Sequence, residues 1–274
     1  MRRSPLLVAL FIPAALAAQG NPNPVPADPS PWPQHSLERP KPPVVTPGAF
    51  VGSPPPSDAI VLMDGRSMAR WRSTSMPSDP TGGAPGQRPR VAPTARDAAQ
   101  WTIRNDYVEI APGTGGIATR DSFGDVQLHL EWKAPVPAVG DGQHRGNSGV
   151  FLMGTYEVQV LDSYRNETYS DGQAGSLFGQ FPPLVNAMRP PTEWQSYDIV
   201  FRRPRFGADG RIITPARATV FHNGILVQDD QVLLGPTSFG RRAPYEAHPD
   251  RLPIELQDHD YKVRFRNIWV RRLE

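Results

Sequence analysis

The stretch that decides the fold is GNSGVFLMGTYEVQVLD, residues 146–162. Two runs within it, residues 150–153 and 156–161, are rich in the β-branched and aromatic residues that favour strands. Gly154 and Thr155 separate the two runs and predict a tight hairpin. The sequence therefore predicts a pair of antiparallel strands in this stretch.

Polar residues occupy alternate positions of the second strand. Because side chains alternate between the two faces of a strand, Tyr156 and Val158 should face the core. Glu157 and Gln159 should then stand side by side on the other face. Asp162 joins them only if the strand bulges or ends there. A carboxylate beside an amide on one face predicts a ligand-binding surface.

Similar short runs recur beyond residue 58 between Gly, Pro, Asn and Asp, and no window has a sustained helical period. They predict an all-β fold, an antiparallel β-sandwich with long Pro/Gly-rich loops. His222-Asn223-Gly224 predicts a further hairpin, since Asn-Gly readily takes positive φ values. The expected strands are residues 59–63, 101–103, 107–110, 116–119, 125–133, 150–153, 156–161, 194–202, 216–222, 225–228, 254–258 and 263–271.

The N-terminal region has two segments of unusual composition. Arg2, Arg3, an apolar run and the site Ala15-Leu16-Ala17 predict a signal peptide over residues 1–17, with an uncleaved leader as the alternative. The run is too short for a membrane anchor. In residues 18–57 roughly every third residue is proline, which predicts an extended, disordered tether. The folded domain should span residues 58–274.

Composition excludes several classes of protein. The chain has no cysteine, which excludes disulfides, thiolate metal sites and a cysteine nucleophile. Its 29 basic and 27 acidic residues are interspersed and leave a net charge of only +2, so nucleic acid is not an expected partner. With the signal peptide, these features predict a soluble periplasmic or secreted protein.

Two long segments interrupt the expected strands. Residues 73–99 are full of Gly, Pro and Ser and predict a flexible insertion, while residues 166–191 predict a rim of the cleft.

Several separate motifs, in order along residues 58–274, resemble one known bacterial family. They are Val61-Leu62-Met63-Asp64-Gly65, Asn147-Ser148-Gly149-Val150, Tyr156-Glu157-Val158-Gln159-Val160-Leu161-Asp162-Ser163, Asn186 before Pro190-Pro191-Thr192-Glu193-Trp194, Thr219-Val220-Phe221-His222-Asn223-Gly224, Leu256-Gln257-Asp258-His259, and Val263-Arg264-Phe265-Arg266-Asn267-Ile268-Trp269-Val270. The family that they resemble is the 3-keto-disaccharide hydrolase domain.

This resemblance implies a concanavalin-like jelly roll and action on glycosides oxidised at C3, with release of the 3-keto sugar. It also implies a partner oxidoreductase that makes the 3-keto substrate. The sequence departs from the family pattern in the insertion after Trp71 and in Tyr261 after Asp260. Both departures concern the edge of the cleft more than its chemistry.

A carbonyl at C3 acidifies the C2 proton, so cleavage needs a base, an acid and a group that holds the developing oxyanion. Glu157 is the first candidate, and His259, flanked by Asp258 and Asp260, is the second. The alternatives are a solvent-facing strand glutamate and a turn histidine. No cofactor is certain, but Glu157 and His259, with Asp258 or Asp162, could bind a divalent metal ion.

Further polar residues are candidates for binding the sugar, because carbohydrate sites need planar polar side chains. For the loop residues among them the alternative is a hairpin role, and for Asn186 an Asx turn. The candidates are Arg145, Asn147, Ser148, Gln159, Asp162, Asn186, Gln257 and Asp258.

Two other functions stay open at this point. A non-catalytic carbohydrate-binding module has the same fold. A classical glucanase would need a second carboxylate beside Glu157. The amide of Gln159 in that position argues against the glucanase, unless Asp162 supplies the second carboxylate.

Overall fold

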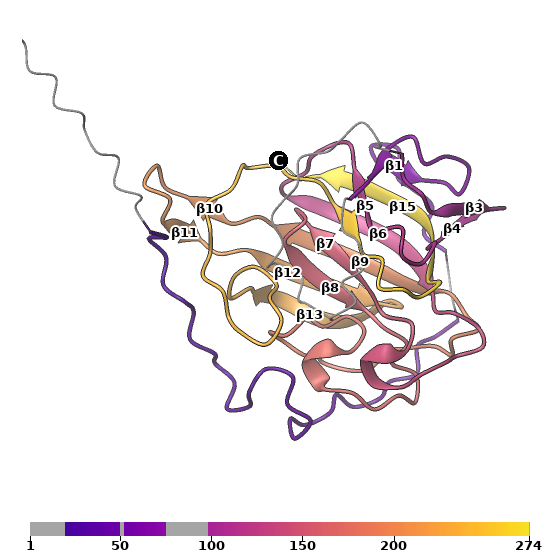
Figure 1. The fold of residues 1–274 in the computed structure, drawn as a ribbon, viewed down its shortest axis with the longest axis horizontal. Coiled ribbons are helices and arrows are strands. Elements are labelled where there is room, and N and C mark those ends of the chain that lie inside the picture. The colour runs from indigo at the N-terminus through magenta and orange to yellow at the C-terminus, as the bar shows by residue number, and fades with distance from the viewer. Residues whose placement is uncertain (1–19, 50–51, 75–97, 274) are drawn as a thin grey trace, which may run out of the picture.

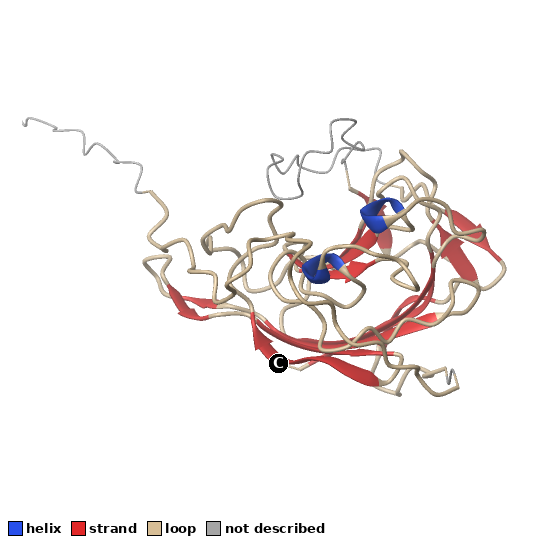
Figure 2. Cartoon of the chain, turned by 90° about the horizontal axis from the view of Figure 1, so that it is seen from below, coloured by secondary structure: helices blue, strands red, loops and turns tan. Residues whose placement is uncertain are grey.

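A computed structural model describes residues 20–49, 52–74 and 98–273. The predicted signal peptide, residues 1–17, and most of the predicted insertion, residues 73–99, lie outside these ranges. Within them, the chain forms two antiparallel sheets that pack face to face (Figures 1 and 2). The predicted all-β antiparallel sandwich of jelly-roll type is confirmed.

The larger sheet has eight strands within the described residues and curves along one side of the domain (Figure 2). Its strands run in the order β13-β12-β9-β6-β15-β4-β3, and β1 pairs with β15 beside β4. They are β1 (Ile60–Met63), β3 (Thr102–Arg104), β4 (Tyr107–Glu109), β6 (Val126–Lys133), β9 (Gln195–Arg202), β12 (Arg217–His222), β13 (Ile225–Val232) and β15 (Arg264–Arg272).

The smaller sheet has five strands in the described part of the chain, in the order β2-β5-β14-β7-β8. It carries the stretch that predicts the fold. Its strands are β2 (Trp71–Ser73), β5 (Ile117–Thr119), β7 (Ser148–Leu152), β8 (Tyr156–Val160) and β14 (Glu255–Leu256). A separate two-stranded ribbon joins β10 (Arg205–Phe206) to β11 (Ile212–Thr214).

Every strand expected from the sequence is present, with ends shifted by a few residues. The strands that the sequence pattern did not predict, β2, β10 and β11, are two or three residues long. Both predicted hairpins are confirmed. Asn223 and Gly224 have φ values of 53° and 79° between the paired residues His222 and Ile225, as a two-residue type I′ turn requires.

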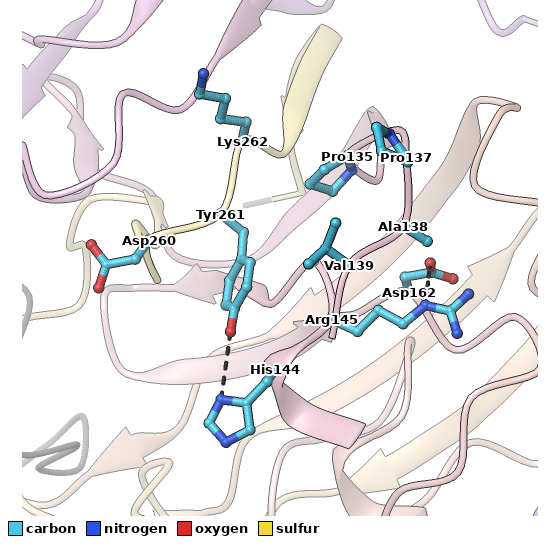
Figure 3. Close-up of a pocket in the computed structure, with 11 residues that line it drawn as sticks. Pro135, Pro137, Ala138, Val139, His144, Arg145, Asp162, Asp260, Tyr261 and Lys262 are labelled. Carbon is cyan, nitrogen blue, oxygen red and sulfur yellow. Dashed lines mark hydrogen bonds and ion pairs between the residues drawn. The ribbon is translucent and has the colours of Figure 1, made fainter. Parts of the chain in front are cut away.

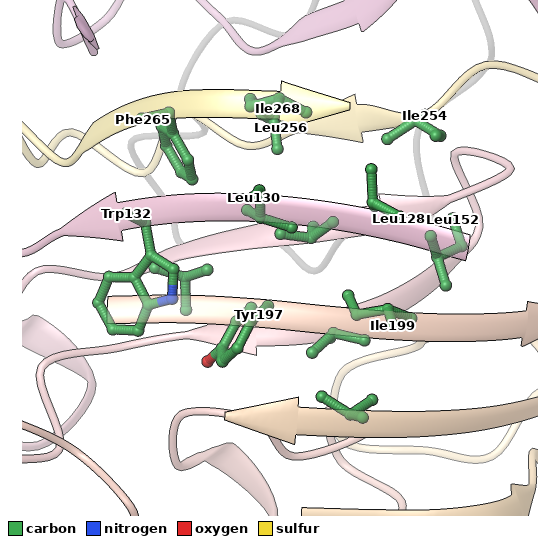
Figure 4. Packing of buried hydrophobic residues seen from close by; sticks show 14 of the residues in the cluster. Leu128, Leu130, Trp132, Leu152, Tyr197, Ile199, Ile254, Leu256, Phe265 and Ile268 are labelled. Atoms are coloured by element: carbon green, nitrogen blue, oxygen red, sulfur yellow. The ribbon is translucent and has the colours of Figure 1, made fainter. Parts of the chain in front are cut away.

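The core fills the space between the two sheets (Figure 4). Leu128, Leu130 and Trp132 of β6 face it from the large sheet, and the apolar positions of β8 face it from the small sheet. Tyr156 and Val158 are 1% exposed, so the predicted alternation of β8 is confirmed. Each such side chain contributes roughly 1.5–3 kcal/mol of burial free energy, which fixes the register of the polar residues between them.

Loops cover the outer face of the small sheet near β8. The short 3-10 helices η1 (Gly142–His144) and η2 (Ser170–Gly172) belong to these loops. Residues 173–178 continue the sheet, since Gln159 N donates to Ser176 O and Phe178 N donates to Glu157 O. Residues 166–191 thus wall this face, and β8 is not a free edge.

Residues 20–49 form an N-terminal arm that runs along the edge of the domain (Figure 1, indigo). Asn23 is buried and bonds to Gly210, Tyr245 and Ile212, while Asn186 exchanges backbone hydrogen bonds with the arm through Pro43 and Val45. The arm therefore differs from the disordered tether predicted for residues 18–57. Proline keeps it extended as expected, but polar contacts with distant loops hold it in place.

Within the described residues, no helix has the length and apolar character needed to cross a membrane.

Candidate functional site

Glu157 lies on the outer face of β8, the face opposite the core. Its neighbours across the ladder are Phe151 of β7 and Phe178 of the following segment. The side chain is buried, with the residue only 3% exposed, and its Oε2 atom has no hydrogen-bond partner in the described part of the chain. Burial raises the pKa of Glu157 well above its usual value. A buried carboxyl group with a free acceptor atom has the properties of an acid–base residue.

Gln159 shares this face with Glu157, as the alternation predicts. With its amide nitrogen turned toward β7, Gln159 donates to Glu157 Oε1 at 3.2 Å and to Ser148 O at 2.8 Å. In this orientation the Oε1 atom of Gln159 faces the side-chain amide of Gln143 at 2.9 Å, and Asn147 Nδ2 donates to Gln143 O at 3.0 Å. A row of amides therefore leads from the carboxyl group of Glu157 to helix η1.

Three other predicted binding residues hold the chain that follows β14. Ser148 Oγ donates to Gln257 O at 2.7 Å. Asp258 accepts from the backbone N–H groups of Gly115, at 3.0 Å, and Asp260, at 2.9 Å. The hydroxyl of Ser148 and the carboxyl of Asp258 are therefore engaged with backbone and support the segment after β14.

A pocket of about 380 Å³ opens beside helix η1 (Figure 3). Arg145 and Asp162, both predicted binding residues, form an ion pair at its wall, with Nε 2.8 Å from Oδ2. Tyr261 reaches across from the segment before β15 toward His144, and its hydroxyl lies 3.5 Å from Nδ1 (Figure 3). β8 ends at Val160, two residues before Asp162, so Asp162 lies beyond the strand and not beside Glu157.

The structure does not bring His259 into contact with Glu157. His259 is exposed and stacks on Tyr261 with 6.1 Å between ring centroids, whereas Glu157 is buried. Neither residue lines the pocket. One chain of contacts that links them runs from Glu157 to Gln159, from Gln159 to Gln143, and then from His144, the neighbour of Gln143, to Tyr261 and His259.

Two roles are predicted for Asn186, an Asx turn and a sugar contact, and the structure shows the Asx turn. Its Oδ1 accepts from Met188 N two residues on, which is an Asx turn, and its Nδ2 donates to Ser163 O. Both polar atoms of the side chain thus bond to the surrounding loops.

The predicted metal ligands do not converge. Among the described residues, no group of three His, Asp or Glu side chains lies close enough to hold a metal ion. Glu157 is surrounded by aromatic and amide groups, and no imidazole approaches it closely enough to hydrogen-bond. The residues present do not fit a divalent ion.

Sequence reasoning did not select Gln143 or Tyr261 for the site. Gln143 lies in a loop that contains Gly140, Gly142 and Gly146, all with positive φ. Several glycines in a short loop indicate a defined backbone conformation and could have drawn attention to it. Tyr261 appeared only as a departure from a family pattern. Tyr261 lines the pocket because the chain before β15 packs beside helix η1, which the sequence pattern does not predict.

Comparisons with known proteins show the family and the fold. The family model described as "3-keto-alpha-glucoside-1,2-lyase-like domain" matches residues 58–271. A "putative glycosyl hydrolase" from Parabacteroides distasonis is 41% identical, with a TM-score of 0.71, over 86% of this chain and 93% of that one. A second structure of the same description and organism is 17% identical, with a TM-score of 0.50, over 79% and 94%, and shows the fold alone. No curated protein matches the chain.

Proposed function

Because the chain belongs to the family of 3-keto-alpha-glucoside-1,2-lyase-like domains, we propose that it cleaves glycosides oxidised at C3 by elimination, followed by hydration. The substrate is a small carbohydrate. A separate oxidoreductase must supply the ketone, since the reaction requires it and the ketone leaves with the released 3-keto sugar. We also propose that the protein acts in the periplasm or outside the cell.

The reaction balances without an added oxidant or reductant. A base removes the C2 proton, and the C–H electrons form an enolate with the C3 carbonyl. The enolate then re-forms the carbonyl as the C1–O bond breaks, which leaves a C1–C2 double bond and a leaving group that takes up a proton. Addition of water across that double bond gives the 3-keto sugar.

The observation that carries this proposal is the buried carboxyl group of Glu157. Burial makes its ionised form a stronger base than an exposed glutamate, and abstraction of a proton next to a carbonyl needs a base of that kind. In this proposal the amides of Gln159 and Asn147 give up their present hydrogen bonds to Glu157 and Gln143 and hold the enolate oxygen as neutral donors. His259 and Tyr261 at the rim are the proposed contacts for hydroxyl groups of the 3-keto ring.

A second candidate function is a carbohydrate-binding module without turnover. The observation that favours it is the separation of the exposed His259 from the buried Glu157. Such a module would bind the sugar and release no product.

Cleavage of 4-nitrophenyl 3-keto-glucoside tests the proposal. Glu157→Gln should lower kcat by at least about 100-fold, since it removes the base, and His259→Ala should also lower turnover. Glu246→Gln, which changes an exposed glutamate, is the matched control and should keep the wild-type rate. A substrate carrying deuterium at C2 should react more slowly than the protonated one if the C2 proton is abstracted.

Wild-type turnover in Glu157→Gln would rule out this base. Saturable binding with no released nitrophenol in the wild-type protein would favour the binding module.

A further inference from the structure

Buried polar atoms without a hydrogen-bond partner gather beside β8. Six such atoms lie there, Glu157 Oε2, Asp171 Oδ1, Gln173 Oε1, Ser176 Oγ, Gln34 Oε1 and His35 Nε2, while others in the described residues, such as the two ring nitrogens of His222, lie elsewhere. Residues 171–178 run next to β8, and the arm residues Gln34 and His35 lie against them. Such atoms are rare in folded proteins, so their gathering in one place indicates a surface that accepts a polar ligand.

The ring of His35 fills a box of three aromatic side chains, which we call the aromatic box. The ring centroid lies 4.4 Å from that of Tyr169, 5.1 Å from Phe178 and 4.6 Å from Phe239. Aromatic faces at this spacing stack with flat rings and with the apolar face of a sugar. The box therefore fits one six-membered ring, and a residue of the arm occupies that place.

A carboxyl group lies at the base of the aromatic box. The side chain of Asp171 is 0% exposed, its Oδ2 accepts from His35 N at 3.0 Å, and the same atom lies 3.9 Å from Arg39 Nη1. Its other oxygen is unpartnered in the described chain. A hydroxyl group on a bound ring would supply the missing hydrogen bond.

His35 enters the box with a backbone φ of +62°, a conformation that non-glycine residues rarely adopt. The arm is anchored on either side of it, at Asn23 and at the backbone contacts with Asn186. Release of His35 alone would thus relieve an unfavourable conformation while the arm stays attached.

The aromatic box adjoins the candidate base. Phe178 belongs to the box and is also the cross-strand neighbour of Glu157, whose carbonyl accepts from Phe178 N at 3.2 Å. Side chains directly opposite each other on a sheet share a face. A sugar that reaches Glu157 with its C2 would therefore have its C1 substituent near the box.

We propose that Tyr169, Phe178, Phe239 and Asp171 form the subsite for the leaving group of the substrate, and that His35 occupies this subsite until a ring-shaped leaving group displaces it. The leaving group is a six-membered ring with an apolar face, either an arene or a second pyranose. This assignment rests on the proposed function for its reaction. The binding site itself stands on the contacts above.

Displacement of His35 reduces the apparent affinity for ring-bearing ligands, since only the fraction of molecules with an open box can bind. His35→Gly removes the ring and suits the positive φ, whereas His35→Phe keeps a ring in the box. The two variants differ in whether the box is open. Leu37→Ala, in an exposed part of the arm, is the control.

Calorimetry with unoxidised ligands tests the subsite without any turnover. We expect His35→Gly to bind 4-nitrophenyl glucoside and a glucose disaccharide about 3- to 10-fold more tightly than the wild type. His35→Phe should bind these ligands no more tightly than the wild type. The double variant His35→Gly/Tyr169→Ala should bind them about ten-fold more weakly than His35→Gly alone. Methyl glucoside, whose leaving group is methanol and not a second ring, should bind all variants alike.

Equal or weaker binding of the ring-bearing ligands by His35→Gly would overturn the proposal, as would a matching gain for methyl glucoside. A gain for the arene alone assigns the subsite to aryl glycosides, and a gain for the disaccharide alone assigns it to a second sugar. If ring-bearing ligands bind as expected but no 3-keto-glucoside is cleaved, the proposed reaction is wrong and the binding subsite still stands.

Discussion

The carboxyl group of Glu157 lies directly over Gly149 on the neighbouring strand β7. A Cβ atom at residue 149 would come within 2.4 Å of Glu157 Oε1 and 2.9 Å of the Phe151 ring. Glycine at this position therefore makes room for the only carboxyl group on the outer face of β8. The contact between Gly149 of β7 and Glu157 of β8 therefore connects the pairing of these two strands with the position of the proposed base.

Gly149→Ala should displace this carboxyl group while the sheet stays intact. We expect a loss of about 1–3 kcal/mol in the free energy of unfolding from overpacking and a fall in kcat of about 100-fold from misplacement of the base. Urea unfolding and a 3-keto-glucoside assay would measure the two effects. Gly48→Ala is the matched control, since a Cβ there meets no atom within 4 Å. Undiminished kcat in Gly149→Ala would show that the position of Glu157 does not matter.

Arg145→Ala should destabilise the protein because it leaves the carboxyl group of Asp162, 1% exposed, without its charge partner. We expect a loss of about 2–4 kcal/mol at neutral pH. Burial already raises the pKa of Asp162, so the loss should shrink as the pH falls toward the ordinary pKa of aspartate and protonation removes the charge.

Urea unfolding at pH 7 and pH 4 would check this expectation. Arg70→Ala breaks the pair with Asp121, in which both side chains are about half exposed, and should change stability by less than about 1 kcal/mol. Equal losses in the two variants would contradict the role given to burial.

His129 should stabilise the large sheet in its charged form. Burial acts to lower its pKa, but hydrogen bonds to Asp198 and Glu131 outweigh it and raise the pKa to about 8. Because the folded-state pKa exceeds the unfolded value of 6.5, the stabilisation is complete below pH 6.5 and is lost as the pH rises through 8. The total is about 2 kcal/mol. Unfolding free energies between pH 6 and 9 should show this decline in the wild type, and a flatter curve in His129→Gln.

His222 should have the opposite effect on pH dependence. It is fully buried between the sheets, and burial, with the nearby charge of Arg189, lowers its pKa to about 3. Below pH 6.5 the unfolded chain binds a proton at His222 that the folded protein does not bind, so the free energy of unfolding falls as the pH drops from 6.5 toward 3. His222→Phe removes both ring nitrogens, which have no partner in the described chain. Its stability relative to the wild type should rise by about 2 kcal/mol between pH 7 and pH 5. A constant difference over that range would mean that His222 is protonated in the folded state.

Sequence patterns were sufficient for the sandwich and for the faces of its strands. Alternation in residues 156–160 depends on the two-residue period of a strand, and burial of Tyr156 and Val158 leaves Glu157 and Gln159 only the outer face. The same reasoning failed for the arm. A proline-rich composition predicts an extended backbone but says nothing of hydrogen bonds to Tyr245 or Asn186, more than 140 residues away.

The sequence by itself determined the all-β class, the hairpins and the strand that carries the candidate base, because these depend on local periodicity and turn chemistry. Only the tertiary structure decided that Glu157 is buried, that His259 lies apart from it at an exposed rim, and that His35 fills a ring of aromatic side chains. Those relationships join residues distant in the chain, and their physical cause is the packing of loops across a sheet face, which no local pattern encodes.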